Sequence, residues 1–535
     1  MKKSFINLLR QPDSVLFQFD DSGVRFEEPD GREEQNARLD YVVGENSAKV
    51  VIYPAEKGIK RVKLRWRGDM SDVILTVGDE YERSQWTNTL WTGLYPNKQM
   101  PWYFYAFDGE VLNSFGVKTG PSAFAIWQCD SSGITLWLDV RSGGSGVMLK
   151  EPLTAVEVVC REGKVGETPY QSAVAFCKMM CEKPKLPQEP VFGVNNWYWA
   201  YGNITHDSVM EETKYLKEMC ADAVCNPYMV IDDGWQKVRY SAGGSRYFNG
   251  GPWDEVAKGF TSMEETALRI KEQGAKPGIW FRPLKTALQV PQEAFSKSDS
   301  KSAGISLDPT HPCVAEMVAT DVKRIRSWGY ELIKHDFTTM DVLTKMPMAD
   351  ANWKLYDNSI TSCQALRCLY QLIQDSADGA IVIGCNTMNH LAAGIHEVQR
   401  SGDDTSGNVF EITRHSGVHT FVRMPQNKTF FIHDPDCAAF TDRVPHDINL
   451  DFLEASAISG AATLASVVPN TLTNEEMARI RKIYKIASEG GAGAVPTDWL
   501  GNNEPSKFLC ADGKQVAFDW YRVYDGVRNF YKWDN

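Results

Sequence analysis

A charged triplet closes an apolar stretch near the middle of the chain. Residues 330–337 read YELIKHDF, which is apolar enough for a buried strand, and Gly329 before them is a typical stop for a preceding helix. A charged pair at the C-terminal end of a buried strand is costly in free energy unless something there uses it. We therefore interpret Asp336 as a candidate catalytic carboxylate, with Lys334 beside it as a substrate ligand or electrostatic partner.

Polar residues and tryptophans also end the other strand-like segments in this half of the chain. In order, these ends carry Trp197, Asp232-Asp233, Trp280 with Arg282, Lys334 with Asp336, Cys385-Asn386, Arg400 with Asp403-Asp404, and Asp434 with Asp436. Carboxylates at this density suit either a metal site or sugar chemistry, in which two carboxyl groups act together. Sugar chemistry fits better, because only His335 and His433 lie near these ends, and His335 should point to the opposite face of its strand from Asp336. We expect no metal.

Each of these residues also has a purely structural explanation. The Asp-Asp-Gly-Trp stretch at 232–235 could be a turn, and Arg400 could form a surface ion pair with the aspartates that follow it. Lys334 and Asp336 could be a buried ion pair with a structural role. The two tryptophans at strand ends would more often lie in a core. A functional interpretation is favoured because such residues recur at equivalent points of successive units.

The order of secondary structure expected for residues 191–490 explains why those ends should meet. Apolar strand-like runs alternate with helical patterns, for which Ser208 with Glu211 and Thr261 with Glu264 are spaced as capping boxes. About eight such units fit a (β/α)8 barrel, which spans roughly 250 residues or more and has its active site at the C-terminal ends of its strands. A doubly wound open sheet is the alternative, but no Gly-X-Gly-X-X-Gly turn follows the first strand.

Segments of different character flank this region. Residues 1–182 carry many short strand patterns between turn residues and predict an N-terminal β-sandwich domain. Residues 183–190, KPKLPQEP, have the proline content of a linker. Residues 491–535 predict a short C-terminal β segment. The aromatic stretch at 86–105 belongs either to the core of the sandwich or to a neighbouring site.

Composition and charge bound the class of protein. The 535 residues are 43% hydrophobic with a net charge of −12, which argues against nucleic acid or an anionic membrane as a partner. The apolar run at the start stops at Arg10, too soon for a signal peptide, and nothing approaches the ~18 apolar residues of a membrane span. The 12 cysteines lack framework spacing, so we expect reduced, mostly buried thiols and a cytoplasmic location.

The motifs at the strand ends resemble those of a known enzyme family. WYW, IDDGWQ, KPGIW, DPTHP, IKHD, RSGDD and HDPDC are similar to segments of the α-galactosidases of glycoside hydrolase family 36, which is related to family 27, and the resemblance covers residues 191–490. It implies a retaining glycoside hydrolase with a β-domain before a (β/α)8 barrel, and no cofactor. Its partner would be a small carbohydrate substrate with a terminal α-galactosyl group, and a homo-oligomer stays open.

The resemblance also implies a role for each candidate residue. Asp336 falls on the nucleophile, and Asp404 rather than Asp403 falls on the acid/base. The residues that would contact the sugar are Asp232 and Asp233 at its 4- and 6-hydroxyls, Lys334 and Arg400 at other ring hydroxyls, Trp280 and Trp197 at the pocket wall, and Cys385 and Asn386 near its 2-position. Ionised Asp336 would raise the pKa of Asp404 and Arg400 would lower it, so the outcome stays open.

The sequence departs from the family pattern at two places. His335 stands inside the Lys-X-Asp triplet where the family has an apolar or aromatic residue, and ASVVPN at 465–470 lacks the acidic pair expected on the last strand. The alternatives are a raffinose-synthase-like α-galactosyl transglycosylase, a hydrolase of α-N-acetylgalactosaminides or β-L-arabinopyranosides, and an inactive sugar-binding protein. The intact pair of carboxylates argues against an inactive protein.

Overall fold

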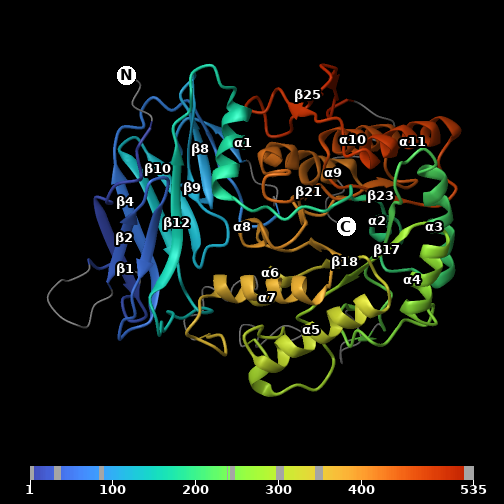
Figure 1. The fold of residues 1–535 in the computed structure, drawn as a ribbon, viewed down its shortest axis with the longest axis horizontal. Coiled ribbons are helices and arrows are strands. Elements are labelled where there is room, and N and C mark those ends of the chain that lie inside the picture. The colour runs from blue at the N-terminus through green and yellow to red at the C-terminus, as the bar shows by residue number, and fades with distance from the viewer. Residues whose placement is uncertain are drawn as a thin grey trace.

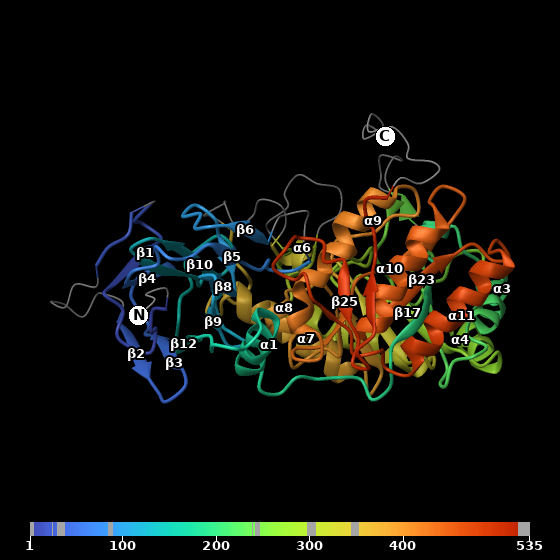
Figure 2. The ribbon, with the colours of Figure 1, turned by 90° about the horizontal axis from the view of Figure 1, so that it is seen from above.

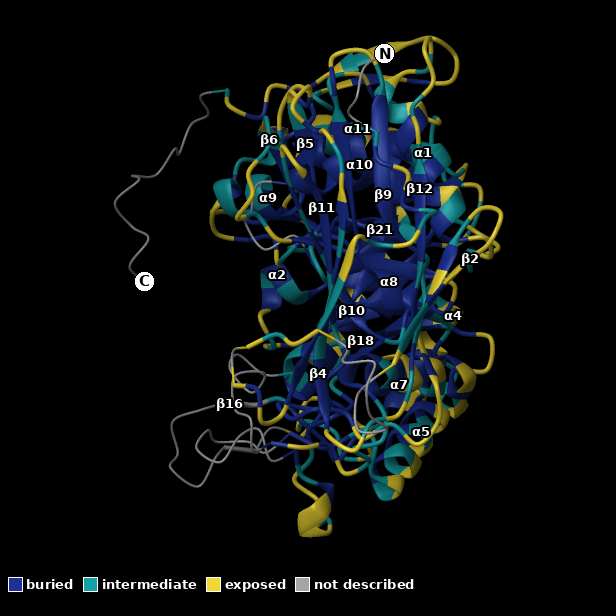
Figure 3. Cartoon of the chain, turned by 90° about the vertical axis from the view of Figure 1, so that its left-hand side faces the viewer, coloured by how far each residue is buried: buried dark blue, intermediate teal, exposed yellow. Residues whose placement is uncertain are grey.

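The chain folds into a β-rich part, formed by its first third, and a mixed α/β part, formed by the rest (Figure 1). The structure, a computed structural model, describes residues 5–23, 25–28, 38–83, 89–237, 239–240, 247–296, 306–343 and 353–522. Buried residues fill the interior of both parts (Figure 3). All 12 cysteines are unpaired, and most are buried. Among the described residues, no helix is both long and apolar enough to cross a membrane.

The N-terminal part is built from two antiparallel sheets. One has the strand order β1 (Ser14–Phe19), β4 (Ile59–Arg67), β11 (Gly133–Asp139), β10 (Phe124–Asp130) and β7 (Met100–Pro101). The other has the order β2 (Leu39–Val43), β3 (Ala48–Ile52), β12 (Leu153–Arg161), β9 (Leu112–Val117), β8 (Tyr103–Phe107), β5 (Leu75–Val77) and β6 (Leu90–Thr92). They pack face to face: the rings of Tyr41 and Trp66 lie 5.6 Å apart, and those of Phe104 and Trp127 lie 6.1 Å apart. The sandwich expected from the strand patterns is present.

One helix and an irregular segment lead from the sandwich to the second part. α1 (Pro169–Met180) begins after Thr168, whose hydroxyl accepts a hydrogen bond from the N–H of Gln171 at 3.2 Å, and it packs on β9. The residues between α1 and β13 (Phe192–Asn195) are all described, and none is in a helix or strand. Figure 2 shows this segment, which includes the proline-rich residues 183–190, running from α1 to the barrel.

The second part is a ring of parallel strands. Its order is β13, β14 (Tyr228–Ile231), β17 (Lys276–Phe281), β18 (Leu332–His335), β19 (Ile381–Gly384), β20 (Val398–Arg400), β21 (Ile432–Asp434) with β22 (Ala438–Phe440), and β23 (Thr463–Val467), which returns to β13. β21 pairs with β20 and β22 pairs with β23, so two halves of one interrupted strand close the ring. Across the interruption, the N–H of Ala462 donates to the carbonyl of His433 at 2.7 Å. Strands that pair in chain order match the expected (β/α)8 barrel and exclude a doubly wound sheet.

Helices connect the strands and cover the outside of the ring. The long ones are α3 (His206–Met219), α4 (Met263–Glu272), α5 (Pro312–Ser327), α7 (Ser362–Ser376), α10 (His446–Ser459) and α11 (Asn474–Ser488). Shorter ones are α2 (Trp197–Ala200), α6 (Thr338–Leu343), α8 (Asn389–Ala392), α9 (Phe410–Ser416) and the 3-10 helix η3 (Val418–Gln426). The apolar stripe of α5 is buried at Val314, Val318, Val322 and Ile325.

Two predicted helix starts are wrong. Thr205 caps α3, because its hydroxyl accepts the N–H of Ser208 at 3.2 Å, so Ser208 is the third residue of the helix and not its cap. Ser262, and not Thr261, caps α4, because its hydroxyl accepts the N–H of Glu265 at 3.0 Å. In both helices the cap is the last residue with an extended backbone, which the spacing of polar residues does not reveal.

Three short strands follow α11 and form a small antiparallel sheet. They are β24 (Val495–Pro496), β25 (Lys507–Leu509) and β26 (Gln515–Ala517). The ring of Phe508 lies 5.4 Å from that of Phe421 in η3, and the indole N–H of Trp499 donates to the carbonyl of Val422 at 2.6 Å. The C-terminal sheet is therefore packed onto the barrel region instead of standing alone.

Candidate active site

Alternation along β18 decides where its charged residues point. Leu332 lies in an apolar cluster inside the barrel, and Lys334, two residues later, points to the same face at the mouth. Its buried ammonium donates to Oδ2 of Asp232, at the end of β14, at 2.7 Å. Burial alone would lower the pKa of Lys334, but the nearby acidic groups, of which Asp232 is the strongest, together outweigh burial and raise this pKa well above its usual value. The ion pair of Lys334 is with Asp232 and not with Asp336.

The Asp232-Asp233 pair is held by the end of β13 and by its own turn. The amide of Asn195 donates to Oδ2 of Asp232 at 2.6 Å, and the side-chain oxygen of Asn196 accepts the N–H of Asp232 at 2.9 Å. Oδ1 of Asp233 accepts from the amide of Gln236 at 2.5 Å. Both carboxyl groups are buried, so their positions are set before any ligand binds.

Asp336 follows β18 directly and is half-buried. Its Oδ2 accepts the indole N–H of Trp280 at 3.1 Å, and its Oδ1 accepts the backbone N–H of Phe337 at 2.7 Å. The strand register pairs Trp280 with Lys334, which places both side chains on the face that carries the site. Phe337 has φ of +61°, a left-handed conformation that is rare for a bulky residue, so the chain turns sharply after the carboxylate. Two N–H donors stabilise the charge on Asp336.

Arg400, at the end of β20, joins three elements of the mouth. Its Nη2 donates to Oδ1 of Asp404 at 2.9 Å and to Oδ2 of Asp436 at 2.5 Å, and its Nη1 donates to Sγ of Cys385 at 3.4 Å. The hydroxyl of Tyr198 donates to the same oxygen of Asp436. Asp436 is thus the buried counterion of Arg400. The side chain of Asp404, in contrast, is 57% exposed and stays accessible to a ligand.

The charges from neighbouring strands converge on the end of β19. Burial raises the pKa of the Cys385 thiol well above its usual value, Asp336 raises it further, and Lys334 and Arg400 lower it. The N–H of Cys385 donates to the carbonyl of His335, between Lys334 and Asp336, at 2.9 Å, and the thiol contacts Arg400 at 3.4 Å. The structure therefore brings the predicted residues of β18, β19 and β20 together in one site.

The N-terminal sandwich reaches into this site through the loop after β5. Glu82 accepts a hydrogen bond from the amide of Asn386 at 2.5 Å, and burial raises the pKa of Glu82 to about 7 although Arg83 opposes this. Nη1 of Arg83 donates to Oδ1 of Asp404 at 2.9 Å, and its Nη2 lies 3.3 Å from Oδ1 of Asp403. Asp404 therefore contacts arginines from two different parts of the molecule.

These arginines decide the pKa of Asp404. Burial raises this pKa, but the nearby cations, of which Arg400 and Arg83 are the strongest, together outweigh burial, and the pKa lies below its usual value. Lys334 acts in the same direction. Solvent screens the charges in part, because the carboxyl is more than half exposed. The sequence left open whether the pKa of Asp404 is raised or lowered. Nearby cations lower it, and one of them, Arg83, comes from the sandwich.

The aromatic residues divide between the site and the core. Trp197 is half-buried in α2, with its ring 5.6 Å from that of Tyr201. Its neighbour Tyr198 is the member of the WYW motif that contacts the counterion of Arg400. Trp102 is buried where the sandwich meets the barrel part, stacked on a histidine of α8 at 5.1 Å. Trp86, a candidate for reaching the site, lies outside the described residues.

His335 points away from the mouth, as the alternation of the strand predicts. Its Nε2 lies 3.0 Å from Nε2 of His396, and its ring lies 5.8 Å from that of Tyr370 on α7. Burial lowers the pKa of His335 to about 3, so the ring is neutral near pH 7. His335 therefore packs between the barrel and its helices, against His396 and Tyr370.

Comparison with known proteins was made by sequence and by structure. No protein-family model matches the chain. Over 98 residues it is 35% identical to the bifunctional alpha-galactosidase/sucrose kinase AgaSK of Mediterraneibacter gnavus, a stretch that makes up 18% of this chain and 9% of that protein. TtGalA, the alpha-galactosidase from Thermus thermophilus solved with p-nitrophenyl alpha-D-galactopyranoside, matches 90% of this chain and 99% of its own, with a TM-score of 0.58 and 16% identity.

Two further structures extend this comparison. AgaA, a GH36 alpha-galactosidase from Geobacillus stearothermophilus solved as a variant with stachyose, matches 93% of this chain and 79% of its own, with a TM-score of 0.61 and 11% identity. The chain has the fold of the GH36 alpha-galactosidases. The galactosidase domain of AgaSK agrees, covering 93% of this chain and 78% of its own with a TM-score of 0.58 and 12% identity. The resemblance seen in the strand-end motifs is confirmed for the GH36 fold.

Four residues of the site in this GH36 fold were missed from the sequence. Asn195 and Tyr198 flank Trp197 at the end of the first barrel strand, so the strand-end pattern contained them, but the tryptophan was chosen instead. Nothing local marks Glu82 and Arg83, because they belong to a loop of the sandwich. Arg83 and its carboxylate partner are 321 positions apart in the chain.

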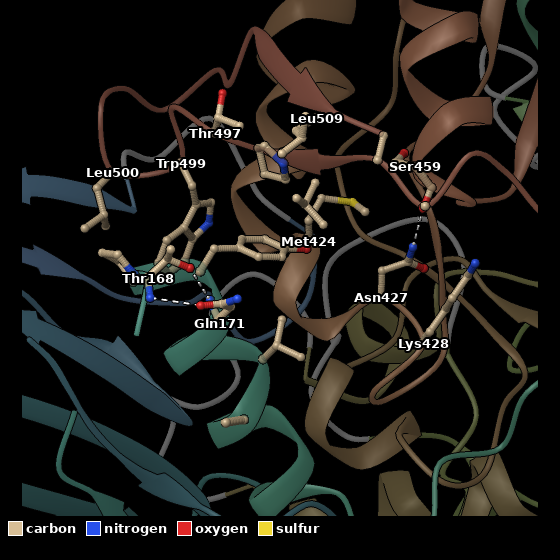
Figure 4. A pocket seen from close by; sticks show the side chains of 18 of the residues that line it. Thr168, Gln171, Met424, Asn427, Lys428, Ser459, Thr497, Trp499, Leu500 and Leu509 are labelled. Atoms are coloured by element: carbon tan, nitrogen blue, oxygen red, sulfur yellow. Dashed lines mark hydrogen bonds between the residues drawn. The ribbon is translucent and has the colours of Figure 1, made fainter. Parts of the chain in front are cut away.

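A separate cavity lies between α1, η3 and the C-terminal sheet (Figure 4). It has a volume of about 770 Å³, and Gln171, Met424 and Trp499 are among the residues around it. Among the described residues that line it, none is a candidate site residue. Within the described ranges, no three His, Cys, Asp or Glu side chains are grouped so that they could hold a metal ion.

Proposed function

We propose that this chain is a retaining exo-α-galactosidase, which hydrolyses terminal α-galactosyl residues of oligosaccharides or glycosides by double displacement. The observation that carries the proposal is the Asp336 carboxylate, held by two N–H donors at the end of β18, in a mouth that also contains the accessible carboxyl of Asp404. The fold shared with α-galactosidases supports it.

The two carboxyl groups divide the reaction into two displacements. First, Asp336 attacks the anomeric carbon, the bond to the leaving oxygen breaks, and Asp404 gives its proton to that oxygen. The products are a glycosyl ester of Asp336 and the released alcohol. Then Asp404, now a carboxylate, takes a proton from water as that water attacks the anomeric carbon and frees Asp336. Two inversions leave the configuration retained.

The buried aspartate pair supports selectivity for galactose. Asp232, held by Lys334 and Asn195, and Asp233 beside it would accept hydrogen bonds from the axial 4-hydroxyl and the 6-hydroxyl. Glucose carries its 4-hydroxyl equatorially, and a buried acceptor that loses its donor costs several powers of ten in selectivity in comparable sites, roughly 10⁴. Trp280 would form a wall against the apolar face of the sugar.

The end of β19 supports a small group at the sugar's 2-position. The side chain of Asn386 is engaged on both sides, by Glu82 and by the N–H of Met340 at 3.0 Å. Cys385 directly follows β19, and its thiol contacts Arg400 among the charged groups of the mouth. We propose that Arg400 and Cys385 contact a 2-hydroxyl.

A panel of aryl glycosides tests this function with the wild type and Asp336→Ala. We expect turnover of the α-galactoside, and a loss of roughly a thousandfold or more in kcat for Asp336→Ala, because the covalent step loses its nucleophile. Thermal unfolding of both proteins is the control for folding. Equal turnover by the two proteins would refute Asp336 as the nucleophile.

The same panel decides among the alternatives. Faster turnover of the α-N-acetylgalactosaminide or the β-L-arabinopyranoside than of the α-galactoside would identify that sugar, and not galactose, as the substrate. Transfer products that dominate over free galactose in excess acceptor sugar would identify a transglycosylase. Saturable galactose binding with no turnover of any glycoside would identify a sugar-binding protein.

A further inference from the structure

The loop that follows β5 is fixed to the barrel by a buried ion pair. The side chain of Asp79 is fully buried and accepts hydrogen bonds from Nε of Arg423 at 2.7 Å, from the amide of Asn389 at 2.7 Å and from that of Gln426 at 2.9 Å. Three side chains of the barrel part therefore hold the loop four positions before Arg83. Arg83 therefore extends into the mouth from a loop that is held in place at Asp79.

Arg83 itself is directed at the two aspartates after β20. It is only 9% exposed, and its Nη1 and Nη2 contact Asp404 and Asp403 at 2.9 and 3.3 Å. Its Nε has no hydrogen-bond partner among the described residues. Burying a guanidinium is costly in free energy, and an incompletely bonded one more so. Despite this cost, the loop places the positive charge of Arg83 beside Asp404.

We propose that Arg83 is a positioning residue for the acid/base carboxyl: it fixes Asp404 in place and confines the reaction to more acidic solution. This rests on the proposed function, in which Asp404 must hold a proton when the cycle starts. It gives the N-terminal sandwich a part in catalysis, because the barrel alone would leave this carboxyl with a single arginine contact.

The ionisable groups around the acid/base carboxyl come from several elements. Arg400 of β20 and Lys334 of β18 act with Arg83 to favour its ionised form. Tyr198 of α2, the adjacent Asp403, and Asp436, which shares Nη2 of Arg400 with Asp404, are further ionisable neighbours. Without Arg83, the carboxyl keeps only the contact with Arg400 at 2.9 Å, so it is held by one arginine instead of two and keeps its proton to higher pH.

The test compares kcat/KM for p-nitrophenyl α-D-galactopyranoside across pH in the wild type, Arg83→Gln, Arg83→Lys and Arg269→Gln. On the alkaline side kcat/KM follows the protonated fraction of Asp404. Arg83→Gln should therefore raise the ratio of alkaline-side to acid-side kcat/KM severalfold. Arg83→Lys keeps the charge and should leave the ratio near the wild-type value, even with a lower rate. Arg269→Gln removes an exposed charge on α4 and should change neither the ratio nor the rate.

A purely structural role gives a different pattern. Arg83→Gln would then lower kcat/KM by the same factor at every pH, or leave it unchanged, and either result overturns the proposal. Thermal unfolding checks each variant, and Arg83→Met provides a second uncharged side chain if Arg83→Gln does not fold. Failure of the proposed function is distinct, because the wild type itself would then release no p-nitrophenol at any pH.

Discussion

At the scale of single residues, burial makes His335 a source of acid sensitivity. Its pKa is about 3 in the folded protein, whereas the pKa of an exposed histidine is about 6.5. Between these values the unfolded chain binds more protons, so the stability from this residue is complete above about pH 6.5 and is lost as pH falls towards 3. We expect His335 alone to cost about 2 kcal/mol of unfolding free energy between about pH 6.5 and 5.

The variant His335→Gln removes this titration and keeps a polar side chain beside His396. Its unfolding free energy should fall less steeply with decreasing pH than that of the wild type, by the contribution of about one proton. Urea unfolding at several pH values between about 5 and 7 measures the slope. Curves that stay parallel over this range would show that His335 is not the proton acceptor.

At the scale of elements, α7 packs on the outer face of the strand that carries Lys334, through Tyr370 and His335. The residue that caps α7 makes two hydrogen bonds, one within the helix and one to the sandwich. Thr361 accepts the N–H of Gln364 at 3.0 Å, and its hydroxyl also donates to the carbonyl of Ser122 in the sandwich at 2.6 Å. Thr473 caps α11 with the same local motif but is exposed. The two caps therefore differ in burial and in one hydrogen bond that crosses between the parts.

Replacing these caps should separate two contributions to the unfolding free energy: that of the cap within the helix and that of the hydrogen bond between the sandwich and the barrel part. Thr473→Ala should lower the unfolding free energy by about 1 kcal/mol. Thr361→Ala should cost about 1–3 kcal/mol more, because it also removes the hydrogen bond to the partly buried carbonyl of Ser122. Denaturant unfolding of both variants measures the difference. Equal losses would mean that the bond to Ser122 adds nothing to stability.

At the scale of the whole molecule, a buried charge joins the sandwich to the barrel. Asp79 and Arg423 form a contact at 2.7 Å between side chains that are 0% and 3% exposed. Asp79→Ala should lower the unfolding free energy by about 3–5 kcal/mol, because it leaves a buried guanidinium without a counterion. It should also reduce glycosidase activity, since the loop that carries Glu82 and Arg83 loses its anchor.

The control for Asp79→Ala is Glu272→Ala, which breaks the exposed pair with Arg269 and should cost no more than about 1 kcal/mol. Thermal unfolding and turnover of p-nitrophenyl α-D-galactopyranoside are measured on both. Full activity in Asp79→Ala, with the fold intact, would show that the loop holds its position without the ion pair.

The sequence by itself determined which residues stand at the ends of the barrel strands. Period-two alternation and apolar runs mark a strand locally, so Asp232, Trp280, Asp336 and Arg400 could be located, and the face of His335 could be inferred. The repeated strand–helix order predicted the barrel for the same reason. Helix starts were less certain, because a cap depends on backbone conformation, and Thr205 and Ser262 show this.

Only the tertiary structure decided which charges pair. Lys334 lies two residues from Asp336, but its ammonium meets Asp232, at the end of a different barrel strand, instead. Arg83 could not be placed from sequence at all, because a loop of another sheet brings it to Asp404. Ion pairs depend on distances between side chains, and those distances exist only after the sandwich has docked on the barrel.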